Sequence, residues 1–148
     1  MQRLIRTADE LAAAIKGRSD GVLSRRPDAK NWAKEIVCHL RDTEEVFAAR
    51  VEQVRVMDVD PRWGDSNADR MAEERQYQKN DVEEALGAFR RRRAETLELF
   101  AGLARAVWEK GGIHPVRGRF TIDQVLSIMA WHDDNHLDQL ARALEGRV

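Results

Sequence analysis

Apolar residues recur every three or four positions along most of the chain, which is the spacing of an amphipathic α-helix. Only three prolines interrupt this pattern, at positions 27, 61 and 115. No segment alternates polar and apolar residues for long enough to indicate a β-sheet. The pattern therefore predicts an all-α protein whose helices lie between the prolines.

Four helices are predicted from the apolar pattern and from capping signals. They cover residues 7–22, 31–58, 81–107 and 121–146, and the polar, unpatterned stretch 61–80 is predicted to be a long connection. Three helix starts carry a capping box, in which a side chain at the first position and a Glu or Gln three residues later bond free backbone amides: Thr7, Asp81 and Thr121. Four such helices with one long crossover indicate an antiparallel four-helix bundle, and a length of 148 residues suits a single domain, 1–148.

The charge pattern argues against a nucleic-acid partner. Charged residues make up 34% of the chain, but the formal net charge is −1, so no overall positive field would attract a polyanion. The four consecutive arginines at 90–93 would wrap around a helix, and acidic residues at 83, 84, 95 and 98 neutralise their surroundings. We expect a solvated, ion-paired face there.

The sequence also argues against a membrane partner. The longest apolar stretch, residues 125–131, is interrupted by Ser127 and is far too short to span a bilayer. The first 18 residues contain Arg3 and Arg6 and no uninterrupted apolar segment, so they do not resemble a signal peptide. We therefore expect a cytoplasmic protein, in which the single cysteine, Cys38, is a small core residue.

Histidines on core-facing positions form the main functional candidate. His132 and His136 stand four residues apart in the last predicted helix, so their side chains point the same way with Cβ atoms about 5–6 Å apart. His39 lies on the apolar stripe of the second predicted helix. Three imidazoles from two packed helices would hold a metal ion and leave a coordination position open, as catalytic sites do. The alternative is that each is a hydrogen-bonded core histidine, because an unpaired buried polar group costs roughly 1–3 kcal/mol.

Two other residues are candidates for supporting roles. Asp42, one turn beyond His39, is a candidate acceptor for the second N–H of an imidazole, with a solvated surface acid as the alternative. His114 is a candidate proton shuttle or substrate contact at the mouth of the site, with a surface loop histidine as the alternative. The segment HDDNH lacks the glutamate of the HExxH zinc motif, and we expect Asp133 and its neighbour Asp134 to face solvent.

Two segments of the chain resemble the DinB/YfiT-like proteins. They are NWAKEIVCHLRDTEEVF, residues 31–47, and IHPVRGRFTIDQVLSIMAWHDDNHLDQL, residues 113–140. The resemblance implies a four-helix bundle with a long crossover between the second and third helices. It also implies a divalent metal, zinc or nickel, bound by the residues that match the family's histidines: His39, His132 and His136.

The resemblance leaves the activity less well defined. Some members of the family are thiol-dependent transferases or isomerases that use bacillithiol or mycothiol, and an open metal site lowers the pKa of a bound thiol or water. Our main hypothesis is a metal-dependent S-transferase that moves a low-molecular-weight thiol to a small electrophilic substrate. The alternatives are a metal-dependent hydrolase and a non-catalytic, metal-stabilised binding or dimerisation module.

Aromatic residues with no place in the helical pattern are candidate contacts for a homodimer: Trp63, Tyr77 and Trp108. Trp32 and Trp131 are expected to pack inside the bundle or at an interface.

Overall fold

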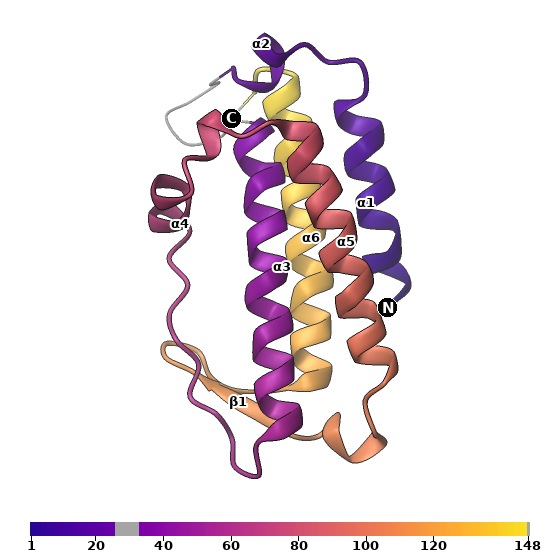
Figure 1. Cartoon of the computed structure of the whole chain (residues 1–148), viewed down its shortest axis with the longest axis vertical. Helices are drawn as coiled ribbons and strands as arrows, with labels where there is room; N and C mark the ends of the chain where they lie inside the picture. Colours follow the sequence, from indigo (N-terminus) through magenta and orange to yellow (C-terminus); the bar gives the residue numbers. More distant parts are fainter. Residues whose placement is uncertain (26–32, 148) are drawn as a thin grey trace.

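Four long helices form a four-helix bundle in the computed structural model, which describes residues 1–25 and 33–147 (Figure 1). They are α1 (Gln2–Ile15), α3 (Ala33–Val56), α5 (Val82–Ala101) and α6 (Ile122–Leu144). The shorter elements are α2 (Asp20–Leu23), α4 (Ala68–Glu74), the 3-10 turns η1 (Tyr77–Lys79) and η2 (Arg105–Val107), and the strands β1 (Gly111–His114) and β2 (Gly118–Thr121). The predicted connection around Pro27, the predicted helix start at Asn31, and Trp32 lie outside the described residues.

The helix directions follow from the long connection between α3 and α5. This connection runs back along the length of the bundle, so α3 and α5 point one way while α1 and α6 point the other (Figure 1). Helix α3 packs against α5 and α6, and α1 packs against the same two helices from the opposite side. The predicted all-α bundle with a long crossover is therefore confirmed, and α3 and α6 are antiparallel neighbours.

The apolar faces of the helices bury two clusters of side chains. One cluster is centred on residues of α1, α3, α5 and α6 that include Leu11, Leu40, Phe89 and Leu140. The other includes Phe47 of α3, with Phe100, Val125 and Met129. Burying such side chains stabilises the fold by roughly 1.5–3 kcal/mol each relative to an exposed position. None of the helices in the described ranges is long and apolar enough to cross a membrane.

The first helix begins five residues earlier than predicted, and this changes the role of Thr7. Thr7 is fully buried inside α1 and caps nothing: its hydroxyl donates to Asp133 Oδ2 at 2.5 Å. The prediction that Asp133 faces solvent is wrong, whereas Asp134 is exposed as expected. The buried Asp133 carboxylate is paired with Arg93, whose Nη1 donates to its Oδ2 at 2.6 Å.

Arg93 also departs from the expected solvated arginine face. It is only 3% exposed, and its guanidinium bonds both Asp133 and, at 2.8 Å, Glu44 Oε2 of α3. The arginines do point to different sides of α5, as predicted, and the fourth, Arg93, therefore faces the interior of the bundle. Buried charges persist when they are paired and hydrogen-bonded, so this cluster joins α1, α3, α5 and α6.

The loops contain more structure than the sequence predicted. The connection 61–80 forms α4 and η1, and its start lies beside β1: the Trp63 N–H donates to Ile113 O at 2.9 Å and the Ile113 N–H to Pro61 O at 2.8 Å. Strands β1 and β2 pair as an antiparallel hairpin that was not predicted, because four-residue strands are too short to show a period of two. Gly118 has a φ of 79°, which glycine adopts at little cost in the turn of this hairpin.

Two of the three predicted capping boxes form at least in part. The Thr121 side chain accepts from Gln124 N while the Gln124 side chain accepts from Thr121 N, which is a complete box. The Asp81 side chain accepts from Glu84 N at 2.9 Å at the start of α5. This helix ends at Ala101, six residues before the predicted end, and η2 follows it.

Candidate metal centre

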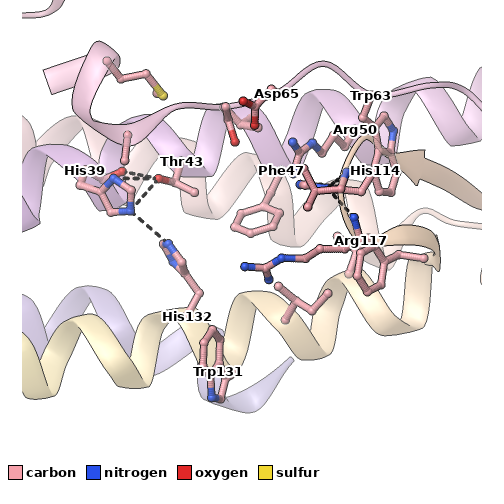
Figure 2. Close-up of a pocket in the computed structure, with 18 residues that line it drawn as sticks. His39, Thr43, Phe47, Arg50, Trp63, Asp65, His114, Arg117, Trp131 and His132 are labelled. Atoms are coloured by element: carbon pink, nitrogen blue, oxygen red, sulfur yellow. Dashed lines mark hydrogen bonds between the residues drawn. The ribbon is translucent and has the colours of Figure 1, made fainter. Parts of the chain in front are cut away.

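The three core histidines converge on one point between α3 and α6. One ring nitrogen from each of His39, His132 and His136 lies within 4.8 Å of the other two. His39 Nε2 and His132 Nε2 lie 3.1 Å apart, as drawn in Figure 2. The two α6 rings meet edge to face, with centroids 4.4 Å apart, because their positions differ by about one helical turn. The antiparallel packing of α3 then places His39 against both.

Burial keeps the imidazoles neutral. It lowers the pKa of His39 to about 4, and the proximity of His136 adds to the effect. It lowers the pKa of His132 to about 2, and the proximity of His136, His39 and Arg93 adds to the effect. The pKa of His136 is also lowered by burial. At neutral pH all three rings therefore carry a nitrogen lone pair, which is the form that binds a metal ion.

Hydrogen bonds at the rim orient the rings. His136 Nδ1 lies 2.8 Å from Gln139 Oε1, and the amide oxygen can only accept, so the proton sits on Nδ1 and the lone pair on Nε2. Thr43 donates its hydroxyl proton to the His39 carbonyl at 2.7 Å. The same hydroxyl oxygen lies 3.3 Å from His39 Nε2, so the Thr43 oxygen is a hydrogen-bond acceptor near the point where the three rings meet.

This donor set fits a divalent transition metal. Three neutral imidazoles suit zinc or nickel, and hard ions such as magnesium and calcium prefer oxygen ligands. Among the described residues the ligand group contains no carboxylate or thiol. Three protein ligands leave at least one coordination position for water or substrate, which distinguishes a catalytic site from a closed structural one.

A pocket leads to the histidines from one side of the bundle. Its volume is about 390 Å³, and His39 and His132 lie at one end (Figure 2). Phe47 lies midway along it, and Arg50, Trp63 and His114 lie at the opposite end, near the hairpin (Figure 2). A second cavity of about 350 Å³ reaches His39 and His136 from elsewhere, lined also by Glu35 and Gln139. The centre is thus accessible from two directions.

Asp42 does not support an imidazole in the way proposed from the sequence. Its carboxylate accepts from Arg41 Nε at 2.7 Å, Arg75 Nη1 at 2.8 Å and Arg92 Nη1 at 2.9 Å. Three residues correspond to about 300° of helix, so Asp42 is turned from His39 toward α5. It is not a surface acid either, since it is fully buried. Burial alone would raise the pKa of Asp42, but the hydrogen bonds and charge of Arg41 lower it to about 2.

His114 is part of the pocket. It ends β1, and its Nδ1 accepts from the backbone amides of Val116 at 3.2 Å and Arg117 at 3.3 Å. Burial and the nearby charges of Arg50 and Arg117 lower its pKa. The neutral ring therefore carries its proton on Nε2, as a donor at the hairpin end of the pocket.

The remaining candidate residues are placed as follows. Cys38 is fully buried and burial raises the pKa of its thiol to about 11, which agrees with a core residue. Trp131 is 63% exposed and lines the pocket, so it does not pack inside the bundle, and the alternative place at an interface stays a prediction. Trp63 and Tyr77 are buried within this chain, so neither is exposed for contact with a second copy.

The sequence reasoning missed Arg50 and Arg117 as pocket residues. Arg50 follows His39 by eleven residues, which is close to three full helical turns, so helical periodicity alone would have placed it on the same face. Arg117 lies in the turn of the hairpin, and no local pattern indicated that this turn reaches the site.

The fold and the centre together define a four-helix bundle with a three-histidine cluster between two of its helices. The family model of the DinB superfamily matches residues 3–140, and the chain belongs to that superfamily. A search of curated proteins gave no match.

Among solved structures, the chain is similar to YfiT from Bacillus subtilis, described as "a probable metal-dependent hydrolase with an unusual four-helix bundle topology". The two chains are 18% identical with a TM-score of 0.88, and the match covers 96% of this chain and 82% of YfiT. At this identity the likeness establishes the shared fold.

Proposed function

We propose that the protein is a metal-dependent hydrolase of a small-molecule substrate, with a zinc or nickel ion held by His39, His132 and His136. The convergence of three neutral imidazoles at the end of an open pocket carries this proposal. The description of YfiT as a probable metal-dependent hydrolase supports it. A divalent ion in such a site polarises a substrate carbonyl or phosphoryl group and lowers the pKa of a coordinated water.

The residues of the chain supply orientation around that chemistry. Gln139 fixes the His136 tautomer, and the Thr43 oxygen, 3.3 Å from His39 Nε2, would accept a hydrogen bond from a water bound beside that ring. His114 Nε2 carries a proton at the other end of the pocket. Apolar side chains that include Phe47 and Val125 line the pocket between these polar groups, and a hydrogen bond beside apolar side chains is electrostatically stronger than one in water.

Transfer of a low-molecular-weight thiol is the second candidate. It is favoured by the motif resemblance around His39 and around His132 and His136, and the same site would lower the pKa of a thiol as it does that of water. The second cavity beside His39 and His136 gives a separate approach for a co-substrate.

One assay separates the two. Metal-loaded protein is supplied with activated esters and with alkyl electrophiles, in the presence and absence of a thiol. We expect ester hydrolysis without thiol, a loss of about 100-fold or more in His136→Ala, and wild-type rates in Asn135→Ala, an exposed residue of the same helix. Turnover that requires the thiol would assign S-transfer instead. Equal rates in wild type and His136→Ala would remove the metal from the mechanism.

A further inference from the structure

Two arginines give the pocket an excess of positive charge. Its lining contains three charged residues besides the histidines: Arg50, Arg117 and Asp65. Within the described part of the chain, neither guanidinium has a carboxylate within the 4 Å of an ion pair, whereas Arg41, Arg75, Arg92 and Arg93 all do. Arg50 is partly buried and Arg117 is exposed, and both line the pocket.

Arg50 is held in place and partly desolvated. Its Nη2 donates to Gly64 O at 3.1 Å, and its guanidinium lies 5.4 Å from the centre of the Trp63 ring, within cation–π distance. Burial lowers the pKa of Arg50, and the charge of Asp65 offsets this only in part. A guanidinium has five N–H donors in a fixed fork, so most remain for a planar or tetrahedral anion.

Arg117 approaches the same pocket from the hairpin. Its guanidinium extends below Phe47 toward His132, while Arg50 lies at the hairpin end beside Trp63 and His114 (Figure 2). The backbone amide of Arg117 holds His114 Nδ1, which directs the remaining ring proton to Nε2. The pocket therefore presents donors from α3 and from the hairpin.

The rest of the lining suits an organic body. Apolar side chains from α3 and α6 form the wall between the donors: Val46, Phe47, Val125 and Ile128. The cavity volume of about 390 Å³ lies within the range of roughly 300–1,000 Å³ typical of small-molecule sites.

We propose that Arg50 and Arg117 make this pocket selective for small organic anions, molecules with an apolar body whose carboxylate or phosphate is bound by the two guanidinium groups and not by the metal centre. This inference rests on the proposed function, because it names the substrate class of the proposed hydrolase site. Anion binding is measured without turnover, so the binding proposal can be tested separately from the hydrolase proposal.

The test is calorimetric titration with three matched probes: 4-phenylbutyrate, its uncharged amide, and phenyl phosphate. We expect at least one of the two anions to bind about ten-fold or more tightly than the amide. The tighter of the two identifies the preferred anion. Arg50→Gln and Arg117→Gln should each abolish most of this preference, and Arg105→Gln, an exposed arginine of η2, should retain it.

Titrating metal-loaded and metal-stripped protein distinguishes this proposal from the proposed function. The preference for an anion should persist without metal, even if the histidines prove to bind none. A preference that disappears with the metal, or that survives both arginine substitutions, would overturn the proposal, as would equal affinity for anion and amide. Arg117 is exposed in the hairpin turn, so its variant folds even if Arg50→Gln does not.

Discussion

Several of the residues that were placed wrongly from the sequence are charged side chains buried in the interior. Arg93 and Asp133 were expected at the surface, and Asp42 was expected beside an imidazole or at the surface. All three are buried with partners of opposite charge. Arg93 and Asp133 are 40 residues apart, so no local sequence pattern indicates that they pair. The histidine pair was predictable because a separation of four residues is itself local information.

Asp42 provides a pH-dependent contribution to stability. Its pKa is about 2 in the folded protein and 3.8 ordinarily, so its contribution is present above pH 4 and is lost as the pH falls toward 2. We expect Asp42→Asn to lower the free energy of unfolding at pH 7 by on the order of 2–3 kcal/mol, with the difference from wild type shrinking between pH 4 and pH 2. Urea unfolding at several pH values measures this.

Glu45→Gln is the matched control for Asp42. Glu45 also faces Arg75 and Arg92, but its side chain is half exposed, so its loss should cost no more than about 1 kcal/mol. A difference between Asp42→Asn and wild type that stays constant from pH 7 to pH 2 would contradict the assignment.

Gln139 is predicted to act through His136. Gln139→Leu removes the acceptor for the His136 Nδ1 proton, and we expect metal affinity to fall by about 10–100-fold without loss of helix content. Gln139→Glu keeps an acceptor at that position and should restore most of the affinity. Competition with a chromophoric chelator gives the constants, with Gln53→Leu on exposed α3 surface as control. Equal affinity in Gln139→Leu and wild type would rule out this role.

Helices and loops differ in how far the sequence predicted them. The long helices were recognisable because their apolar faces repeat with the helical period over many turns. The hairpin was missed because its four-residue strands are too short to show a period of two. The docked start of the connection was missed because it pairs with a distant part of the chain: Pro61 and Trp63 bond Ile113, about 50 residues away. These same elements build the hairpin end of the pocket.

Gly112 is the position where the hairpin and the connection meet most closely. A Cβ there would lie 2.2 Å from Trp63 Cε2, so Gly112→Ala must displace the indole on which Arg50 rests. We expect a loss of about 1–3 kcal/mol in the free energy of unfolding. Gly64→Ala, in the same connection with nothing within 4 Å, should change it by less than about 0.5 kcal/mol. Chemical unfolding compares them, and equal stabilities would show that this contact does not hold the hairpin.

For the molecule as a whole, sequence pattern and family motif predicted the bundle, its crossover and the convergence of His39, His132 and His136. They did not predict the pocket, since its lining comes from α3, α6, the hairpin and the connection together. Only the assembled bundle brings Arg50 and Arg117 into the cavity that leads to the histidines. The three histidines thus come from two helices, whereas the residues that line the pocket are brought together only by the whole fold.

Elemental analysis tests the central claim, that the three histidines bind one metal ion. The protein is purified without a histidine tag or metal column, incubated with zinc or nickel, and passed through gel filtration. We predict one ion per chain in wild type and in Asn135→Ala, and almost none in His136→Ala. Wild-type protein that retains no ion, or His136→Ala that retains as much as wild type, would contradict the account.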